Sequence, residues 1–288
     1  MPTRRRFVDR TVVVTGASAG IGAAAARAFA AEGARLVLAA RGLERLTRFA
    51  EELRASGNEV AVVRADVSTD EGGRLVLETA LDVFGGFDVW VNNAALHHRG
   101  PVLDLSPESL GDMVSANLRA PIVLTRLAVE HLRTRPEGGT VVQVASLAGF
   151  VPVPGSAVYS ATKFGLRVFS LALDEELRVL PGPCVRVRLV SPGPVATAFL
   201  LDDLDRVADL TFSQPMSTAE AVASDIVEAA FEASDSGKIE RTRPWRSGYL
   251  ATLAYVWPRL GRWARPMLER GGRRMRERLR RAMDGQVT

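Results

Sequence analysis

Short apolar runs rich in β-branched residues alternate with longer amphipathic stretches along most of the chain. The runs predict buried strands over 11–14, 35–39, 60–63, 89–91, 141–144 and 185–190. The stretches between and after them predict helices over 21–32, 43–55, 71–84, 107–132, 157–180 and 218–233. This alternation indicates βαβ units, and therefore an α/β fold with a doubly wound parallel sheet that helices cover on both faces.

Composition and charge separate the end of the chain from the rest. The 288 residues are 47% hydrophobic, enough for one sizeable core, so we expect one domain over 1–240 and an extension over 241–288. The extension holds 13 Arg and 3 acidic residues, whereas acidic residues outnumber basic ones in the part before it. The single cysteine, Cys184, excludes an internal disulfide and favours a reducing compartment. Because no apolar run approaches the length of a membrane span, we expect a cytoplasmic protein.

A glycine-rich turn follows the first predicted strand. Residues 15–22 read Thr-Gly-Ala-Ser-Ala-Gly-Ile-Gly and lead directly into an alanine-rich helix. Gly16, Gly20 and Gly22 let the backbone turn tightly, so that N–H groups at the helix N-terminus face a diphosphate. Their spacing is G-x-x-x-G-x-G and differs from the G-x-G-x-x-G of many dinucleotide enzymes. A turn needed only for chain reversal and close packing is the alternative.

The same turn also fits the nucleophile elbow of serine hydrolases. Gly16, Ser18 and Gly20 match G-x-S-x-G on a strand-to-helix turn, which makes a serine hydrolase the main alternative. Its base would be His97, His98 or His131, the three histidines of the chain. We expect the first two on an exposed loop and His131 as a favourable charge at a helix C-terminus.

Four further residues suggest proton transfer. Tyr159 and Lys163 lie four residues apart on a predicted helix, so they share one face, and an ammonium beside a phenol favours the phenolate. Ser146 follows the strand over 141–144, where α/β sheets place ligands, and its hydroxyl fits a substrate oxygen. Asn117 lies on an apolar helix face, and a water chain leading to Lys163 would satisfy its buried amide. Hydride transfer to a carbonyl needs such groups, since a proton must reach the oxygen.

With these motifs in this order, the chain resembles the classical short-chain dehydrogenase/reductase family over roughly residues 8–240. The matching segments are 15–22, Asp66-Val67, Asn92-Asn93-Ala94-Ala95, Asn117, Ser146, Tyr159 with Lys163, and 192–197. The resemblance implies a Rossmann-type fold, a nicotinamide cofactor and a homodimer or homotetramer. Ala95 stands where the family has glycine, which puts only local packing in doubt.

The resemblance also implies roles for single residues. Asp66 and Val67 would meet the adenine, Asn92 to Ala94 would flank the cofactor, and Val195 and Thr197 would hold the carboxamide. Lys163 would bind the nicotinamide ribose and lower the pKa of Tyr159. The predicted cofactor-binding residues are Gly16, Ser18, Gly20, Ile21, Gly22, Arg41, Asp66, Val67, Asn93, Ala94, Tyr159, Lys163, Pro192, Gly193, Val195 and Thr197; we predict no metal site.

Charge at the end of the second strand predicts the choice of cofactor. An NAD enzyme places a carboxylate there to accept from the ribose 2′-OH, whereas this chain has Ala39, Ala40 and then Arg41. Arg41, with help from Ser18, can pair with a 2′-phosphate, so we predict NADP(H) over NAD(H). A protein that senses the cofactor without catalysis would keep the glycine turn but could lose Tyr159 and Lys163, which this chain retains.

Two apolar segments remain. The segment over 198–212 lies where the family has its substrate lid, which favours a hydrophobic carbonyl or alcohol substrate; an ordinary packed helix is the alternative. Residues 249–257 form an apolar helical stretch, and a basic run over 273–281 follows. The segment 245–281 therefore fits peripheral contact with an anionic membrane. A helix packed over the substrate cleft or a partner subunit is the alternative, and we expect no nucleic acid because no recognition motif accompanies the charge.

Overall fold

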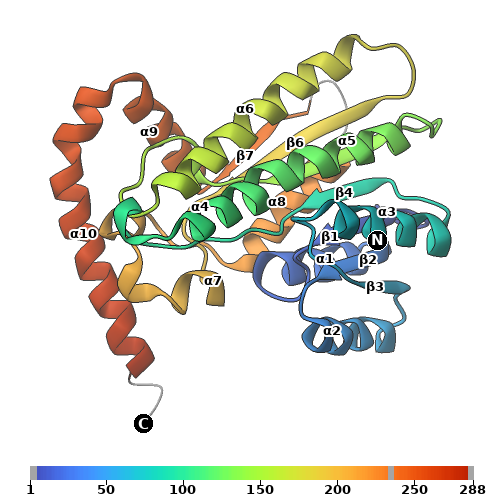
Figure 1. Ribbon diagram of the computed structural model, residues 1–288, viewed down its shortest axis with the longest axis horizontal. Helices are drawn as coiled ribbons and strands as arrows, with labels where there is room; N and C mark the ends of the chain where they lie inside the picture. The colour runs from blue at the N-terminus through green and yellow to red at the C-terminus, as the bar shows by residue number, and fades with distance from the viewer. Residues whose placement is uncertain (1–4, 233–236, 285–288) are drawn as a thin grey trace.

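One seven-stranded sheet organises the protein, which a computed structural model describes over residues 5–232 and 237–284 (Figure 1). All strands run parallel in the order β3-β2-β1-β4-β5-β6-β7. The strands are β1 (Thr11–Thr15), β2 (Arg35–Ala40), β3 (Val60–Arg64), β4 (Val89–Asn92), β5 (Gly139–Val144), β6 (Val185–Pro192) and β7 (Glu240–Arg243). The order reverses between β1 and β4, and ligands bind at such a switch point in doubly wound sheets. The predicted Rossmann-type fold is confirmed.

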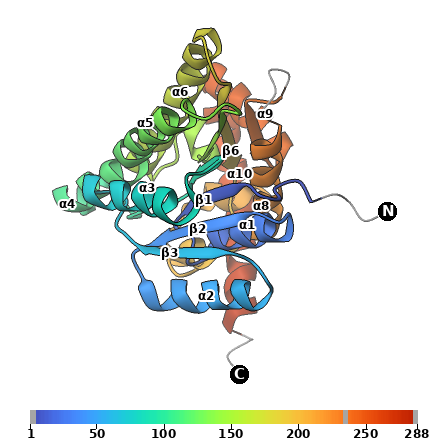
Figure 2. The same ribbon diagram turned by 90° about the vertical axis from the view of Figure 1, so that its right-hand side faces the viewer.

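Helices cover both faces of this sheet because neighbouring strand residues point to opposite sides. On β1, Val12 and Val14 pack in one core with α1 (Gly20–Ala31), α2 (Leu43–Ala55) and α8 (Ala219–Phe231). Val13 packs in a second core with α3 (Asp70–Phe84), α5 (Ala120–Leu132) and α6 (Ala157–Val179). Figure 2 shows α3, α5 and α6 on one side of the strands and α1 and α8 on the other. Thr218 caps α8 by accepting from the N–H of Ala221.

Two elements differ from the prediction. The helix expected over 107–132 is divided into α4 (Pro107–Val114), a π-helical turn η2 (Ser115–Arg119) and α5. No apolar run marks β7, because its residues are polar. Ion pairs hold it instead: Glu240 binds Arg167 of α6, and Arg243 binds Asp225 of α8. The sheet therefore runs through Arg243, past the boundary expected after residue 240.

The last part of the chain forms a helical hairpin of α9 (Trp245–Val256) and α10 (Pro258–Asp284). Figure 1 shows α10 along one edge of the molecule, next to the segment that holds α7 (Ala198–Leu201). We call residues 198–213 the lid; after α7 it contains two short 3-10 helices, η4 (Leu204–Arg206) and η5 (Asp209–Ser213). Two further 3-10 helices, η1 (Val102–Asp104) and η3 (Leu147–Gly149), follow β4 and β5. In the described ranges, no helix is long and apolar enough to cross a bilayer.

Candidate active site

A cavity of about 670 Å³ opens at the carboxyl ends of the strands and gathers most of the predicted site residues. It is lined by Gly16, Ser18, Gly20, Ile21, Arg41, Asp66, Val67, Asn93, Ala94, Ser146, Tyr159, Lys163, Pro192, Gly193, Val195 and Thr197. Gly22, Asn92 and Asn117 are the predicted residues that do not line it. One continuous space therefore joins the glycine turn to the tyrosine and lysine.

The glycine turn is built so that backbone atoms approach one another closely. Gly16 and Gly20 have φ of +66° and +54°, a region that favours glycine. A Cβ at Gly22 would overlap the carbonyl oxygen of Gly16, so Gly22 serves the packing of α1 against the turn. Ala19 precedes α1 and, within the described chain, no side chain caps this helix. Its first N–H groups are thus open to an anion such as a diphosphate.

The loop after β4 is fastened to this turn through Thr15. The Thr15 hydroxyl accepts from the N–H groups of Asn93 and Ala94 at 3.0 and 3.2 Å, and it donates to the carbonyl of Val91 at 3.2 Å. The Asn93 amide donates to the carbonyl of Thr15 at 2.9 Å. Asn92 was expected beside the cofactor as well, but the side chain of this buried residue lies in the core.

The alternation of side chains along a strand explains the place of Asn92. Its amide nitrogen donates to the hydroxyl of Thr125 at 3.0 Å, and its oxygen accepts from the indole of Trp90 at 2.8 Å. Asn92 therefore joins β4 to α5, directly before the loop that begins at Asn93.

At the other end of the cavity, Arg41 and Asp66 follow β2 and β3. Arg41 is exposed, as a group that meets a phosphate in solvent must be. Burial raises the pKa of the Asp66 carboxyl, but hydrogen bonds from Ser68 and the charge of Arg41 outweigh it and lower the pKa overall. Asp66 thus carries its charge at neutral pH, and it accepts from Ser68 through both the backbone N–H and the hydroxyl.

Tyr159, Lys163 and Ser146 meet where β5 ends. Lys163 is almost fully buried and donates from Nζ to the carbonyl of Val144 at 3.0 Å. Burial lowers its pKa to about 8. The ammonium lies 5.6 Å from the centre of the Tyr159 ring. Ser146 hydrogen-bonds the Tyr159 side chain, and its hydroxyl also accepts from the N–H of Ala148 at 3.1 Å.

The pKa of Tyr159 is raised, whereas the sequence predicts a lowered one. Burial raises it above the ordinary value, while the hydrogen bond with Ser146 and the charge of Arg99 act in the opposite sense. Lys163 was expected to lower this pKa, but the opposing cation here is Arg99. A nearby positive charge favours the phenolate, but the cost of ionising a phenol among protein atoms is larger here.

Asn117 acts on the loop that follows Asn93 and Ala94. Its amide oxygen accepts from the N–H of Leu96 and its nitrogen donates to the carbonyl of Leu96, both at 2.7 Å. These two bonds join the buried amide to the backbone of Leu96. Asn117 lies in the π-helical turn η2, which shifts the helix register at this point, and such turns often occur at functional sites.

His97 and Arg99 are site residues that the sequence did not indicate. The ring of His97 stacks on Tyr159, with centroids 4.0 Å apart and an angle of 15°. Its Nε2 is 3.0 Å from the hydroxyl of Ser156, and burial lowers its pKa to about 3, so it is neutral near pH 7. The expected exposed loop is therefore a wall of the cavity. One sequence feature does point to His97 as a site residue: it closely follows the motif Asn92-Asn93-Ala94-Ala95 at the carboxyl end of β4.

Arg99 connects this loop to the lid. Its guanidinium pairs with Asp203 at 3.2 Å and donates to the carbonyl of Phe199 at 2.7 Å. It also lies 5.3 Å from the centre of the Phe199 ring, and its side chain is only 4% exposed. A buried cation thus faces the same cavity as Tyr159.

The lid gives this end of the cavity an apolar wall and rests on α10. Phe199, Leu200, Val207 and Leu210 line the cavity, and Leu279 of α10 packs against the apolar residues of the lid. Asp209 of the lid pairs with Arg273 and Arg276 of α10 at 3.1 and 2.9 Å. The sequence allows 245–281 to contact a membrane or to pack over the cleft. The inner face of α10 packs on the lid of the cleft.

The histidines do not support the hydrolase alternative. His97 contacts Tyr159 and Ser156, and His131 accepts at Nε2 from the N–H of Phe87. Burial and the charge of Arg135 lower the pKa of His131, so the expected positive charge at this helix end is wrong. Within residues 5–232 and 237–284, no histidine forms a hydrogen bond with Ser18.

Comparisons with known proteins agree with this geometry. Residues 10–206 match the family model of the short chain dehydrogenases. The chain is 36% identical over 195 residues to Uncharacterized oxidoreductase YxnA of Bacillus subtilis (strain 168), covering 68% of this chain and 54%, about half, of that protein. It is 34% identical over 239 residues to Tropinone reductase-like 3 of Erythroxylum coca, covering 80% and 88%. It is also 34% identical over 203 residues to L-rhamnose 1-dehydrogenase (NAD(P)(+)) of Azotobacter vinelandii (strain DJ / ATCC BAA-1303), covering 69% and 78%.

Solved structures show the same fold. A metagenomic short-chain oxidoreductase in complex with NADP aligns with a TM-score of 0.70 and 31% identity, over 82% of this chain and 97% of that one. A short-chain type dehydrogenase/reductase from Mycobacterium marinum aligns with a TM-score of 0.75 and 25% identity, over 82% and 94%. By motif, cavity and likeness together, this chain belongs to the short-chain dehydrogenase/reductase family of oxidoreductases.

Proposed function

We propose that the protein interconverts a carbonyl compound and a secondary alcohol with NADP(H), and that Tyr159 is the general acid and base. One observation carries the proposal: Tyr159, Ser146 and Lys163 share a single cavity with the glycine turn. When bound, the cofactor supplies or takes up the hydride. The residues of the chain then have to bind the substrate oxygen and move its proton.

The three side chains divide this task in the direction of reduction. The hydroxyl of Ser146 donates a hydrogen bond to the substrate oxygen, which holds the carbonyl against Tyr159. The Tyr159 hydroxyl gives its proton to that oxygen, and the nearby charge of Arg99 stabilises the resulting phenolate. In oxidation the same groups act in reverse.

Several features fit a phosphorylated dinucleotide on the opposite side of the cavity. The open N-terminus of α1 and the glycine turn suit its diphosphate, and Arg41 suits a 2′-phosphate. Ser18 lines the same part of the cavity. The neighbour solved with NADP supports NADP(H) as the preferred cofactor of this chain.

The lid supports a hydrophobic substrate. Phe199, Leu200, Val207 and Leu210 face the cavity, while Arg99 supplies one buried cation beside them. A substrate with apolar bulk around its carbonyl would bury that surface on binding. The family resemblance supports a homodimer or homotetramer.

A panel of apolar aldehydes and ketones tests the proposal. With NADPH, loss of reduced-cofactor absorbance should appear for at least one class, and Tyr159→Phe should lower kcat by about 10²- to 10⁴-fold while NADPH still binds. Ser18→Ala separates the alternatives, because a serine hydrolase would lose all turnover and would not need NADPH. Full turnover by the Tyr159→Phe protein would refute the proposed mechanism.

A further inference from the structure

Aromatic side chains gather in solvent on the α9–α10 hairpin. Five aromatic residues of the hairpin and one methionine are 59–78% exposed, and we define them as the aromatic patch: Trp245, Tyr249, Tyr255, Trp257, Trp263 and Met267. Soluble surfaces rarely hold so many exposed aromatic rings in one short segment, so the patch indicates contact with a partner. The polar and apolar ends of Trp and Tyr suit the boundary between water and hydrocarbon.

The patch follows the geometry of both helices. On α9, Trp245 and Tyr249 lie one turn apart on the face opposite Ser247 and Ala251, which are buried. Trp257 follows α9 at the turn of the hairpin, and Trp263 and Met267 lie one turn apart at the start of α10. The aromatic patch therefore covers the turn of the hairpin and the outward faces of the helices beside it, except that the ring of Tyr255 also contacts Phe164 of α6, with centroids 5.5 Å apart.

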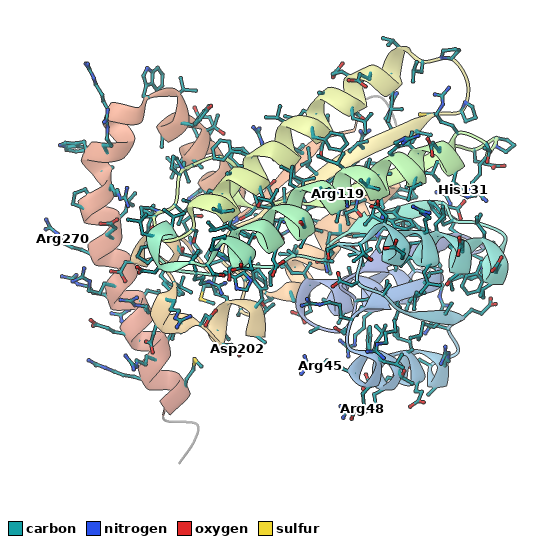
Figure 3. The ribbon with its side chains drawn as sticks, in the orientation of Figure 1. Arg45, Arg48, Arg119, His131, Asp202 and Arg270 are labelled. Carbon is teal, nitrogen blue, oxygen red and sulfur yellow. The ribbon has the colours of Figure 1, made fainter. Side chains whose placement is uncertain are left out.

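The outward face of α10 changes from apolar to basic toward the C-terminus. Spacings of three and four residues continue the face of Trp263 and Met267 through the basic stripe, which we define as Arg270, Arg274, Arg278 and Arg281. All four are exposed and form no ion pair with another described residue. Figure 3 shows Arg270 pointing away from the body of the protein. Glu277 is the one acidic residue of the segment 270–281, so the segment keeps a strongly positive charge.

The inward face of α10 packs against the lid, so the opposite face must point to solvent. A Cβ at Gly272 would overlap the carbonyl of Asp209, so the backbones of α10 and the lid touch at this point. Arg276 donates to the carbonyl of Val207 at 3.1 Å, and Leu279 packs in the apolar cluster of the lid. α10 cannot turn its arginines inward without leaving the lid.

Charge decides which partner fits the outward face. A second copy of the chain, paired through the same face, would bring two basic stripes together, which is unfavourable at short range. An anionic bilayer offers the opposite charge to the stripe and an interface for the aromatic rings. We propose that the aromatic patch and the basic stripe dock the protein on the surface of an anionic lipid bilayer, without crossing it.

This docking would hold the lid, and the cavity behind it, one helix away from the membrane surface and from the compounds dissolved there. The lid rests on the inner face of the helix whose outer face meets the lipid. The link to an apolar substrate rests on the proposed function, whereas docking itself is measured without turnover. Failure of one is therefore distinguishable from failure of the other.

Sedimentation of the full chain with vesicles tests the docking. At about 0.1 M salt the protein should pellet with phosphatidylcholine vesicles that contain about 30 mol% phosphatidylglycerol, and remain in solution with pure phosphatidylcholine. Replacing the four arginines of the basic stripe by Gln should lower the partition coefficient about tenfold or more. Trp257→Ser with Trp263→Ser should lower it by a similar factor.

Matched changes elsewhere should have no effect on partitioning. Arg45→Gln with Arg48→Gln removes exposed charge from α2, and Val179→Ser removes an exposed apolar side chain at the end of α6. NADPH fluorescence titration of every variant checks that the cofactor side is intact. Equal pelleting of all variants, or no pelleting with anionic vesicles, would overturn the proposal. So would a wild-type protein that ignores vesicles and instead dimerises, or binds a DNA duplex, through this hairpin.

Discussion

The two sides of the cavity are built from different kinds of contact. On the cofactor side, backbone atoms of the glycine turn and of the loop after β4 approach one another directly. On the substrate side, long side chains connect segments far apart in the chain: Arg99 reaches Asp203, and Asp209 reaches Arg276. Backbone contacts tolerate no added atom, whereas side-chain contacts can be exchanged. The cofactor side should therefore fail abruptly on substitution and the substrate side gradually.

The largest effect is expected from Gly22→Ala on the cofactor side. The added Cβ would overlap the backbone carbonyl of Gly16, and it would also come within 2.6 Å of the amide nitrogen of Asn93, which is held by its hydrogen bond to Thr15. The free energy of unfolding should fall by about 3 kcal/mol, and NADPH affinity should drop about 100-fold. Thermal unfolding and fluorescence titration measure both. Gly111→Ala in α4 is the control, because its Cβ meets no atom within 4 Å; it should leave stability unchanged or slightly raised.

Arg41→Ala should reduce affinity on the same side without disturbing the turn. Loss of one charge-assisted contact to a 2′-phosphate costs about 2 kcal/mol, so NADPH should bind about 30-fold more weakly while NADH binding stays constant. Arg45→Ala, an exposed arginine of α2, serves as the control. An unchanged ratio of NADPH to NADH affinity in the Arg41 variant would refute the assignment of NADP(H).

On the substrate side, His97 predicts a loss of stability in acid. Its pKa is about 3 in the folded protein against 6.5 in an exposed histidine. As pH falls below 6.5, the unfolded chain binds a proton that the folded protein cannot, which costs about 2 kcal/mol of stability by pH 5. His97→Gln should remove this loss, because glutamine does not titrate. Denaturant unfolding of both proteins at pH 7 and pH 5 gives the comparison, and parallel losses would contradict the prediction.

Arg99→Met should have the smallest effect on turnover. Asp203 is partly exposed and remains solvated without its partner, so KM should rise only about fivefold as the lid loosens. Reduction needs the protonated phenol and declines above the pKa of Tyr159. Because Arg99 lowers that pKa, its loss should move the alkaline limb of the kcat profile to higher pH. Arg119→Met, which breaks an exposed pair with Asp70, should move neither quantity.

The same contrast explains what the sequence could predict. Six strands, the cofactor turn and the tyrosine helix follow from local apolar patterns and short motifs, and they lie where predicted. β7 was missed because its stability comes from partners such as Arg167 and Asp225, which no local pattern marks. Asn92 differs in the other direction. Its motif predicts a residue beside the cofactor, but the alternation of side chains along β4 turns it into the core.

Long-range contacts account for the remaining differences. The pKa of Tyr159 depends on burial and on Arg99, which is distant in the chain. His97 and Arg99 follow the predicted cofactor motif, but only the fold brings them against Tyr159 and Phe199. Such residues can be predicted by including the loop residues that directly follow a cofactor motif at the carboxyl end of a strand.

The contact between Gly272 and Asp209 also bears on the order in which the protein matures. During translation every strand of the sheet leaves the ribosome before α10, so the nascent chain can assemble its nucleotide-binding half early. The chamber for the substrate still lacks the support of its lid at that stage. Competence to bind nucleotide should therefore precede competence to react, and the final helix acts as the last component of assembly.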